Sequence, residues 1–266
     1  VTSAARVGAF ALTPGSADSA LIATLAPGTY SAVIGSADAR IGVGLVEAYD
    51  LSTPTPGQRI NNLSIRAVAG SDADTLIVGL VVEGATSQRY LVRAVGPGLT
   101  AFGVEGALAR PQLAVFSGSN EIARNVGWST SANATVLAET AALSGAFPLA
   151  AGSADSVILT TLAPGAYTAV ISASDNRAGV GLVEVYDLSG DSSAQKLANL
   201  STRAAVGSGE ATLISGLVVG GTAPKRVLIR AAGAALAAFE VANALSRPQL
   251  TLFNAAGTII AQNAGW

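Results

Sequence analysis

Four pairs of charged residues occupy matching positions in the two halves of the sequence, inside segments that are otherwise apolar. They are Glu47 and Glu184, Asp50 and Asp187, Arg66 and Arg203, and Arg93 and Arg230. A carboxylate beside a guanidinium can bind a ligand or act as a general base. The same pair can form a structural bridge that fixes strand register in apolar surroundings. We favour the structural interpretation, because two identical scaffolds in one chain are more common than two identical catalytic centres.

The composition removes most other kinds of catalysis and metal binding. Cys, His and Met are all absent, which excludes disulfides, thiolate chemistry, Cys or His metal ligands and the Ser-His-Asp triad. Asp72-Ala-Asp74 offers two carboxylates to calcium, but the matching place in the second half reads Gly209-Glu-Ala. Glu47 and Asp50 lie three positions apart on a predicted strand, so they point to opposite faces. We therefore expect no enzyme, no metal and no cofactor.

The charge balance also limits the possible partners. Fifteen Lys and Arg against 17 Asp and Glu leave a net charge of −2, and only 12% of the residues are charged. Nucleic acids select dense positive surfaces, so we expect no nucleic-acid partner. No apolar run reaches the length of a membrane-spanning helix, and the longest stretches, such as Leu76–Val82, have the length of a strand. We expect no transmembrane segment.

Two tryptophans follow the same short motif. Trp128 and Trp266 each come directly after Asn-X-Gly. An aromatic ring in such a place can stack on a sugar, but it is more simply a core anchor. We predict a core role for Trp128. Trp266 is the last residue of the sequence, and the strand system that it should close is unfinished there.

An internal repeat must position all of these residues. Gly42-Val-Gly-Leu-Val-Glu-Ala-Tyr-Asp-Leu51 returns almost unchanged at Gly179–Leu188, which is 179 − 42 = 137 positions later. Comparing positions 1–118 with 138–255 in this single register gives 64 identical pairs out of 118. One further residue is inserted after that, because Trp128 matches Trp266 at an offset of 138. The chain is a tandem duplication.

The phase of the repeat predicts the domain organisation. Polar segments rich in Gly, Pro and Ser occur at 52–61 and 189–198, and we interpret them as linkers. One complete unit then covers 62–188. Residues 1–51 form the C-terminal part of a second unit, and 199–266 form its N-terminal part. The two parts either complete each other within one chain or each complete a unit of a neighbouring chain.

Short apolar segments dominate each unit and predict an all-β fold. We expect eight or nine strands per unit in tandem β-sandwich or jelly-roll-like repeats of 137 residues, with one or two short helices each. Three hairpins are predicted, at 20–34, 75–95 and 113–124. The expected helices cover Ser131–Leu143 and Ala234–Leu245, whereas Gly98–Leu108 should form one turn at most.

Many predicted strands are apolar on both faces. Leu213, Leu217 and Val219 lie on one face of their strand, and Ile214 and Val218 lie on the other. A strand that is half exposed should alternate between apolar and polar residues. Either a helix or loop of the same unit covers the second face, or another copy of the chain covers it.

Several phrases together resemble a repeat domain of large secreted and surface proteins of environmental bacteria. They are Asn199-Leu-Ser-Thr-Arg-Ala204, Arg226-Val-Leu-Ile-Arg-Ala231, Arg93-Ala-Val-Gly-Pro97, Thr161-Leu-Ala-Pro-Gly-Ala-Tyr167 and Gly179–Leu188. The later half is similar to the bacterial pre-peptidase C-terminal domain, a β-sandwich appended to exported enzymes. The resemblance implies a non-catalytic module at the bacterial cell surface or outside the cell, and it provides no catalytic residue.

These observations lead to two functional hypotheses. The first is a non-enzymatic extracellular repeat protein that builds a fibre, stalk or filament from copies of itself, joined head to tail by strand complementation. The incomplete unit at each end of the sequence is the observation that supports this hypothesis. The alternative is a module that binds carbohydrate or cell wall beside a secreted enzyme, with a surface glycan as its partner.

Overall fold

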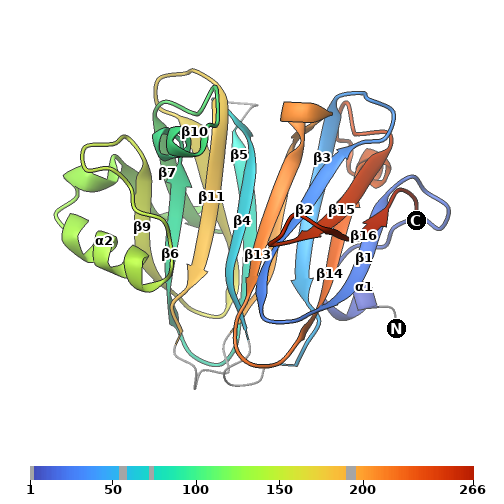
Figure 1. Cartoon of the computed structure of the whole chain (residues 1–266), viewed down its shortest axis with the longest axis horizontal. Helices are drawn as coiled ribbons and strands as arrows, with labels where there is room; N and C mark the ends of the chain where they lie inside the picture. Colours follow the sequence, from blue (N-terminus) through green and yellow to red (C-terminus); the bar gives the residue numbers. More distant parts are fainter. Residues whose placement is uncertain (1–2, 54–58, 72–74, 190–195) are drawn as a thin grey trace.

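The fold is a sandwich of two antiparallel sheets, seen in a computed structural model that describes residues 3–53, 59–71, 75–189 and 196–266 (Figure 1). The first sheet contains, in spatial order, β1 (Ser19–Leu25), β14 (Lys225–Ala232), β3 (Gly42–Asp50), β12 (Lys196–Val206), β5 (Leu76–Glu83), β10 (Gly165–Ala173), β7 (Pro111–Ser117) and β8 (Asn120–Val126). The second contains β16 (Ile259–Asn263), β15 (Pro248–Asn254), β2 (Gly28–Ser36), β13 (Leu213–Val219), β4 (Ile60–Ala69), β11 (Gly179–Asp187), β6 (Gln88–Val95) and β9 (Ser156–Leu162). The all-β prediction is confirmed.

Helices are few and short. The α-helices are α1 (Ser3–Arg6) and α2 (Ala134–Leu143). Four segments are 3-10 helices: η2 (Pro97–Phe102), η3 (Trp128–Thr130), η4 (Gly209–Ala211) and η5 (Ala234–Phe239). The helices lie at the outside of the sandwich, and α2 lies beside β9 at one end of the molecule (Figure 1).

The two sheets are related by the sequence offset. Shifting each strand of the first sheet by 137 residues, forward or backward, gives the strands of the second sheet in reverse order, so that β3 corresponds to β11 and β14 to β6. Each sheet contains four strands from β4–β11 and four from the two end pieces of the sequence. We call β4–β11 unit 1, and β1–β3 together with β12–β16 unit 2. Each unit is an eight-stranded sandwich in which four strands face four others.

The two end pieces of the sequence form unit 2 together, within one chain. β1 pairs with β14, β3 pairs with β12 and β14, and β2 pairs with β13 and β15, all antiparallel. Of the two arrangements that the sequence allows for 1–51 and 199–266, the structure shows the one inside a single molecule. The strands of the two end pieces thus pair with each other within one chain. Incomplete units at the ends of the sequence therefore no longer support an exchange of strands between chains.

The two units are also joined to each other through both sheets. β12 of unit 2 pairs with β5 of unit 1, and β13 of unit 2 pairs with β4 of unit 1. The strands β4 and β12 begin at Ile60 and Lys196, inside the ends of the predicted linkers. The central linker residues 54–58 and 190–195 lie outside the described part of the chain.

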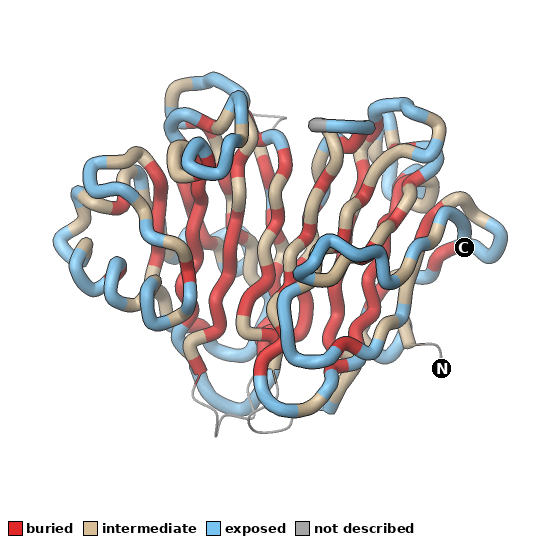
Figure 2. The backbone as a smooth tube through the Cα atoms, viewed as in Figure 1, coloured by how far each residue is buried: buried red, intermediate tan, exposed pale blue. Residues whose placement is uncertain are grey.

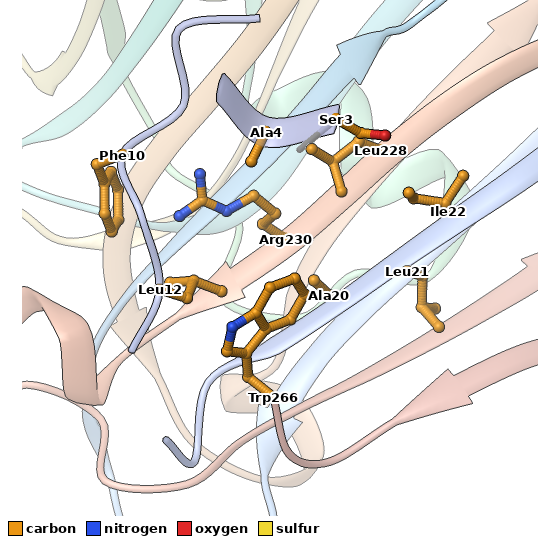
Figure 3. Close-up of a pocket in the computed structure, with 10 residues that line it drawn as sticks. All are labelled: Ser3, Ala4, Phe10, Leu12, Ala20, Leu21, Ile22, Leu228, Arg230 and Trp266. Atoms are coloured by element: carbon orange, nitrogen blue, oxygen red, sulfur yellow. The ribbon is translucent and has the colours of Figure 1, made fainter. Parts of the chain in front are cut away.

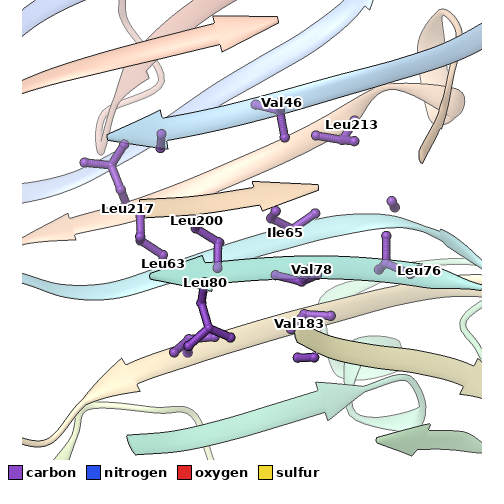
Figure 4. Packing of buried hydrophobic residues seen from close by; sticks show 14 of the residues in the cluster. Val46, Leu63, Ile65, Leu76, Val78, Leu80, Val183, Leu200, Leu213 and Leu217 are labelled. Atoms are coloured by element: carbon purple, nitrogen blue, oxygen red, sulfur yellow. The ribbon is translucent and has the colours of Figure 1, made fainter. Parts of the chain in front are cut away.

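The core lies between the sheets and follows the two-residue period of the strands. In β13 the burial alternates, so that Leu213, Leu217 and Val219 are buried while Ile214 and Val218 are half-buried. Figure 4 shows Leu213 and Leu217 packing in the same layer as Leu63 and Leu200. Buried residues form continuous stretches along the strands, and exposed ones gather in the loops (Figure 2).

Some strands are buried on both faces, because loop segments of the same unit cover them. Leu91 and Tyr186 on the outer face of unit 1 pack against Trp128, Leu137 and Ala146. The corresponding face of unit 2 packs against the segment before β1, through Ala9 and Leu12. The outer face near the junction of the units is more open, and Ile77 there is 40% exposed. Coverage by the chain's own loops thus explains some, but not all, of the two-faced strands.

Two of the three predicted hairpins are wrong. β1 and β2 lie in different sheets, and so do β5 and β6, so both connections cross the sandwich. Only the predicted pair β7 and β8 forms a hairpin. The apolar residues of β1 and β2 therefore meet across the core, and each strand takes its backbone partners from a distant part of the chain. Apolar and polar residues alternate in the same way in a strand of a hairpin and in a strand that crosses to the other sheet. The sequence pattern therefore could not distinguish the two arrangements.

The prediction of a helix over Ala234–Leu245 is also wrong in extent. The segment forms only η5, a 3-10 helix like its glycine-containing counterpart η2. Two backbone contacts explain the early end: Val43 N donates to Asn243 O at 2.7 Å, and Leu245 N donates to Val43 O at 2.8 Å. These bonds hold the last residues in an extended bridge with β3, so they cannot continue a helix.

Candidate functional site

The charged residues shared by both halves form a buried cluster in unit 1. Arg93 on β6 lies opposite Glu184 on β11, and its Nε is 3.2 Å from Glu184 Oε2. Tyr186 Oη donates to Glu184 Oε1 at 2.7 Å. The Arg93 guanidinium stacks on Phe147, with its carbon 4.4 Å from the ring centre. β-strand periodicity positions Glu184 and Tyr186 on the same face, two residues apart.

Unit 2 contains the same cluster with almost the same geometry. Arg230 Nη1 is 3.4 Å from Glu47 Oε2, and Tyr49 Oη donates to Glu47 Oε1 at 2.6 Å. The Arg230 guanidinium carbon lies 4.3 Å from the centre of the Phe10 ring. Phe10 and Phe147 are equivalent under the offset of 137. Each cluster therefore fastens a covering loop onto the outer face of its sheet through an Arg–Phe contact.

The electrostatics of these clusters follow from burial. Burial raises the pKa of Glu184, and the Arg93 charge and the Tyr186 hydrogen bond partly oppose this rise. Burial and the neighbouring carboxylate raise the pKa of Tyr49 and of Tyr186 well above the ordinary value of a phenol. In each cluster one carboxylate oxygen accepts from the phenol and the other faces the guanidinium. Glu47 and Glu184 are each only 6% exposed, so a substrate has little access to either carboxylate, and this arrangement suits a structural bridge and not a general base.

Arg66 and Arg203 behave differently from Arg93 and Arg230. They lie on β4 and β12, at the outer faces of the junction between the units, where they are half-buried and exposed respectively. Within the described part of the chain, neither forms an ion pair with a carboxylate. The structure thus shows the Arg–carboxylate bridge for two of the four arginines named from the sequence.

Asp50 and Glu47 point to opposite sides of β3. Asp50 faces the space between the sheets, where its Oδ2 is 3.1 Å from the fully buried Nζ of Lys225. Lys196 Nζ lies 3.9 Å from the same oxygen and 3.4 Å from Glu83 Oε2. Comparison of the two halves does not single out Lys225, because its counterpart in unit 1 is Gln88.

Two further buried carboxylates each hold a loop. Asp155 Oδ1 accepts from the backbone N–H groups of Gly96 and Gly98, at 2.8 and 3.2 Å. Asp18 Oδ1 accepts in the same way from Gly233 and Ala235, at 2.7 and 3.1 Å. Both carboxylates also accept from a serine two residues before them, at 2.7 Å. The repeated Ser-Ala-Asp at 16–18 and 153–155 is a visible signal, but this local pattern does not show which distant loop each carboxylate binds.

The two tryptophans lie in different environments. Trp128 is 7% exposed, and its Nε1 donates to Ser153 Oγ at 3.1 Å. Trp266 is 49% exposed and lies beside an apolar groove with a volume of about 400 Å3. Figure 3 shows Trp266 between Leu12 and Ala20, with Arg230 and Phe10 further along the groove. The described residues include no group of three or more carboxylates able to hold a metal ion, and Asp72 and Asp74 lie outside them.

Comparison with known proteins gives no identification. No protein-family model matches the chain, and no curated protein matches it. Two solved structures align with 84% of it, the infectious bursal disease virus Gx strain at 12% identity and the infectious bursal disease virus VP2 subviral particle at 10% identity. Their TM-scores are 0.11 and 0.10, and the chain spans 45% and 44% of their chains. At these TM-scores neither likeness carries an argument about fold or function.

Among the helices that the structure describes, none is long and apolar enough to cross a membrane.

Proposed function

We propose that this chain is a non-enzymatic structural module of a bacterial cell-surface or extracellular protein, whose copies associate head to tail into a fibre or stalk. The observation that carries the proposal is the fate of the charged residues shared by both units. Glu47 and Glu184 each use one oxygen for a tyrosine and face an arginine with the other, and both are buried. These residues stabilise the sandwich and present no reactive group. The resemblance to surface repeat domains supports the location.

The association that we propose uses the outer edges of the sandwich instead of the exchange of strands. At the unit 2 end, β16 carries no charged residue, and Ile259 and Ile260 are 55% and 43% exposed. At the unit 1 end, Ile122 and Val126 on β8 are 42% and 46% exposed, and the two charged residues of β8, Glu121 and Arg124, form an ion pair with each other. An uncharged edge strand is a ready template for pairing with another chain. A contact between β16 of one copy and β8 of the next repeats without closing, so it builds an open fibre.

Light scattering after size-exclusion chromatography, together with negative-stain microscopy, tests this association. The wild-type chain should grow in mass with concentration and form elongated particles. Ile260→Lys places a charge on the β16 edge and should leave a monomer. Ile41→Lys is the matched control, because Ile41 is 73% exposed but lies outside both edge strands. A wild-type chain that stays monomeric at every concentration would overturn the proposal.

Carbohydrate binding is the second candidate, and the exposed Trp266 is the observation in its favour. Sugar sites combine an aromatic platform with several polar groups that bind hydroxyls. The groove beside Trp266 provides few of these, since Ser3 and the buried Arg230 are the polar side chains that line it. Binding on a glycan array that Trp266→Ala abolishes would support this candidate over the structural one.

A further inference from the structure

A hollow lies on the outer face of the first sheet, at the junction of the two units. Its volume is about 430 Å3. Three neighbouring strands form its floor: β3 and β12 of unit 2 and β5 of unit 1. Most of its lining is apolar and consists of Phe10, Leu45, Ile77, Leu236, Phe239 and Val241. Binding sites for small molecules commonly have this size, this apolar lining and a place between two units.

The register of the three strands explains why the floor is low. Ser201 on β12 lies opposite Glu47 on β3 and Gly79 on β5. Two residues further along β12, Arg203 lies opposite Ile77 of β5. Gly79 has no side chain, and a Cβ there would lie only 2.7 Å from Ser201 Oγ. The small residues of the first row thus leave space beside the large side chains of the second row.

Two aromatic rings form one wall of the hollow. Phe239 packs edge-on against Phe10, with the ring centres 5.1 Å apart and the ring planes at 69°. Phe102 and Phe147 form the same kind of pair in unit 1, at 4.9 Å and 72°. Phe239 is nevertheless 57% exposed and Ile77 is 40% exposed. Both side chains therefore keep apolar surface that a ligand can remove from water.

The charges around the hollow leave one cation without a counter-charge. Glu47 lines the hollow, but its carboxylate already faces Arg230 and accepts from Tyr49. Arg203 also lines the hollow, is exposed, and forms no ion pair with any residue that the structure describes. A second hollow, of about 480 Å3, meets the first at Arg203, and Glu240 lines that second one. An anion is therefore attracted to the Arg203 end of the first hollow, and Glu240 disfavours it in the second.

The corresponding place on the second sheet is less accessible. Arg66 lies opposite Ile214 there, as Arg203 lies opposite Ile77 on the first sheet. Arg66 and Ile214 are half-buried, whereas Arg203 and Ile77 are exposed. A ligand therefore reaches the arginine on the first sheet more easily, and Arg66 provides a matched control.

We propose that this hollow binds a small aromatic carboxylate, with its ring against Phe239 and Ile77 and its carboxylate on Arg203. A guanidinium and a carboxylate form paired, charge-assisted hydrogen bonds. The half-buried Ser201 lies two residues from Arg203 on the same face of β12, so its hydroxyl can donate to the same carboxylate. A cation would be repelled by Arg203, and an uncharged ligand would gain nothing from its charge. The site lies in the middle of the first sheet, away from the edge strands β8 and β16, so the association of copies leaves it open.

Isothermal titration calorimetry with 2-naphthoate tests the proposal, and 2-naphthamide serves as a probe of nearly the same shape without the charge. The naphthoate should bind at a single site in each chain. The naphthamide should bind about tenfold more weakly or worse, because it lacks the charge-assisted bonds to Arg203. Acetate, which carries the charge without the ring, should give no measurable heat. On the unmodified chain, added salt should reduce the preference for the naphthoate, because salt screens an exposed charge.

Variants assign the binding to this hollow. Arg203→Gln should abolish the preference for the naphthoate over the naphthamide, and Phe239→Ala should weaken the binding of both probes. Arg66→Gln is the matched control and should leave both affinities unchanged. Arg203 and Phe239 are both exposed, so their variants should keep the Tm of the wild type in calorimetry. The proposal would be overturned if neither probe bound the unmodified chain, if both bound it equally well, or if Arg66→Gln lost the binding that Arg203→Gln kept.

Discussion

Replacing Arg93 by methionine should destabilise the protein strongly while leaving its shape intact. The Arg93 side chain is fully buried, and the Glu184 side chain is 7% exposed. Methionine keeps the apolar stem but leaves the Glu184 carboxylate buried without a cation, which costs about 3–5 kcal/mol of the free energy of unfolding. Unfolding entropy is about 2.1 cal/mol/K per residue, so for 266 residues the loss corresponds to a fall in Tm of about 5–9 °C.

The pH dependence of this loss distinguishes an ion pair from simple packing. Burial raises the pKa of Glu184, and the Arg93 charge lowers it, so Arg93→Met raises that pKa further. A carboxyl group with a higher pKa in the folded state than in the unfolded one contributes stability below the unfolded pKa. That contribution is lost as the pH rises through the folded pKa. The deficit of Arg93→Met should therefore be small near pH 4 and largest at neutral pH.

Urea unfolding from pH 4 to pH 8 measures both the size and the pH dependence of the effect. Arg66→Met is the control, because Arg66 forms no ion pair with a described residue, and it should change the free energy of unfolding by less than about 0.5 kcal/mol. Adding Glu184→Gln to Arg93→Met should recover much of the loss at pH 8. A loss that is equal at all pH values, or no larger than that of Arg66→Met, would refute the reasoning.

Three other substitutions test the carboxylate that binds a loop, a glycine packed against the backbone, and the buried lysine. Asp155→Asn weakens charge-assisted bonds to Gly96 and its neighbours and should lower the free energy of unfolding by about 1.5–3 kcal/mol in urea titrations; an unchanged midpoint would contradict this. Gly96→Ala places a Cβ 1.9 Å from a backbone oxygen and should lower Tm sharply in calorimetry, whereas Gly265→Ala, with nothing within 4 Å, should not. Lys225→Met leaves Asp50 with one cation at 3.9 Å and should cost about 2–4 kcal/mol, and equal stability by chemical unfolding would show that the pair contributes nothing.

The repeat predicted much of this structure because the strands follow apolar patterns that both copies share. The offset of 137 places Arg93 with Arg230 and Glu47 with Glu184, and the structure gives each pair the same surroundings. Sequence spacing did not show which carboxylate each arginine would face. Arg66 lies opposite Leu182 on the neighbouring strand, whereas Arg93 lies opposite Glu184. Only the register of the sheet decides this.

Sheet membership was harder to predict than strand position. Only Ala26 and Pro27 separate β1 from β2, as in a hairpin. They nevertheless enter different sheets, because β14 and β13 provide their partners from more than 170 residues away. A local sequence pattern contains no information about those distant partners. The uncovered groove beside Trp266 was similarly beyond prediction, since it depends on how α1 and the end of the chain lie against β1.

The order of the two units along the chain indicates how unit 2 can find its parts. Unit 1 is contiguous, so its strands can pair without waiting for the rest of the chain. Its inner edges, β4 and β5, then present unpaired backbone groups, and these are the groups that β13 and β12 take up in the finished structure. Lys196, at the start of β12, reaches both Glu83 of unit 1 and the carbonyl oxygens of Asp50 and Ser52 of unit 2. We infer that unit 1 acts as the template on which the two end pieces meet, which is why they complete one sandwich although the whole of unit 1 separates them in sequence.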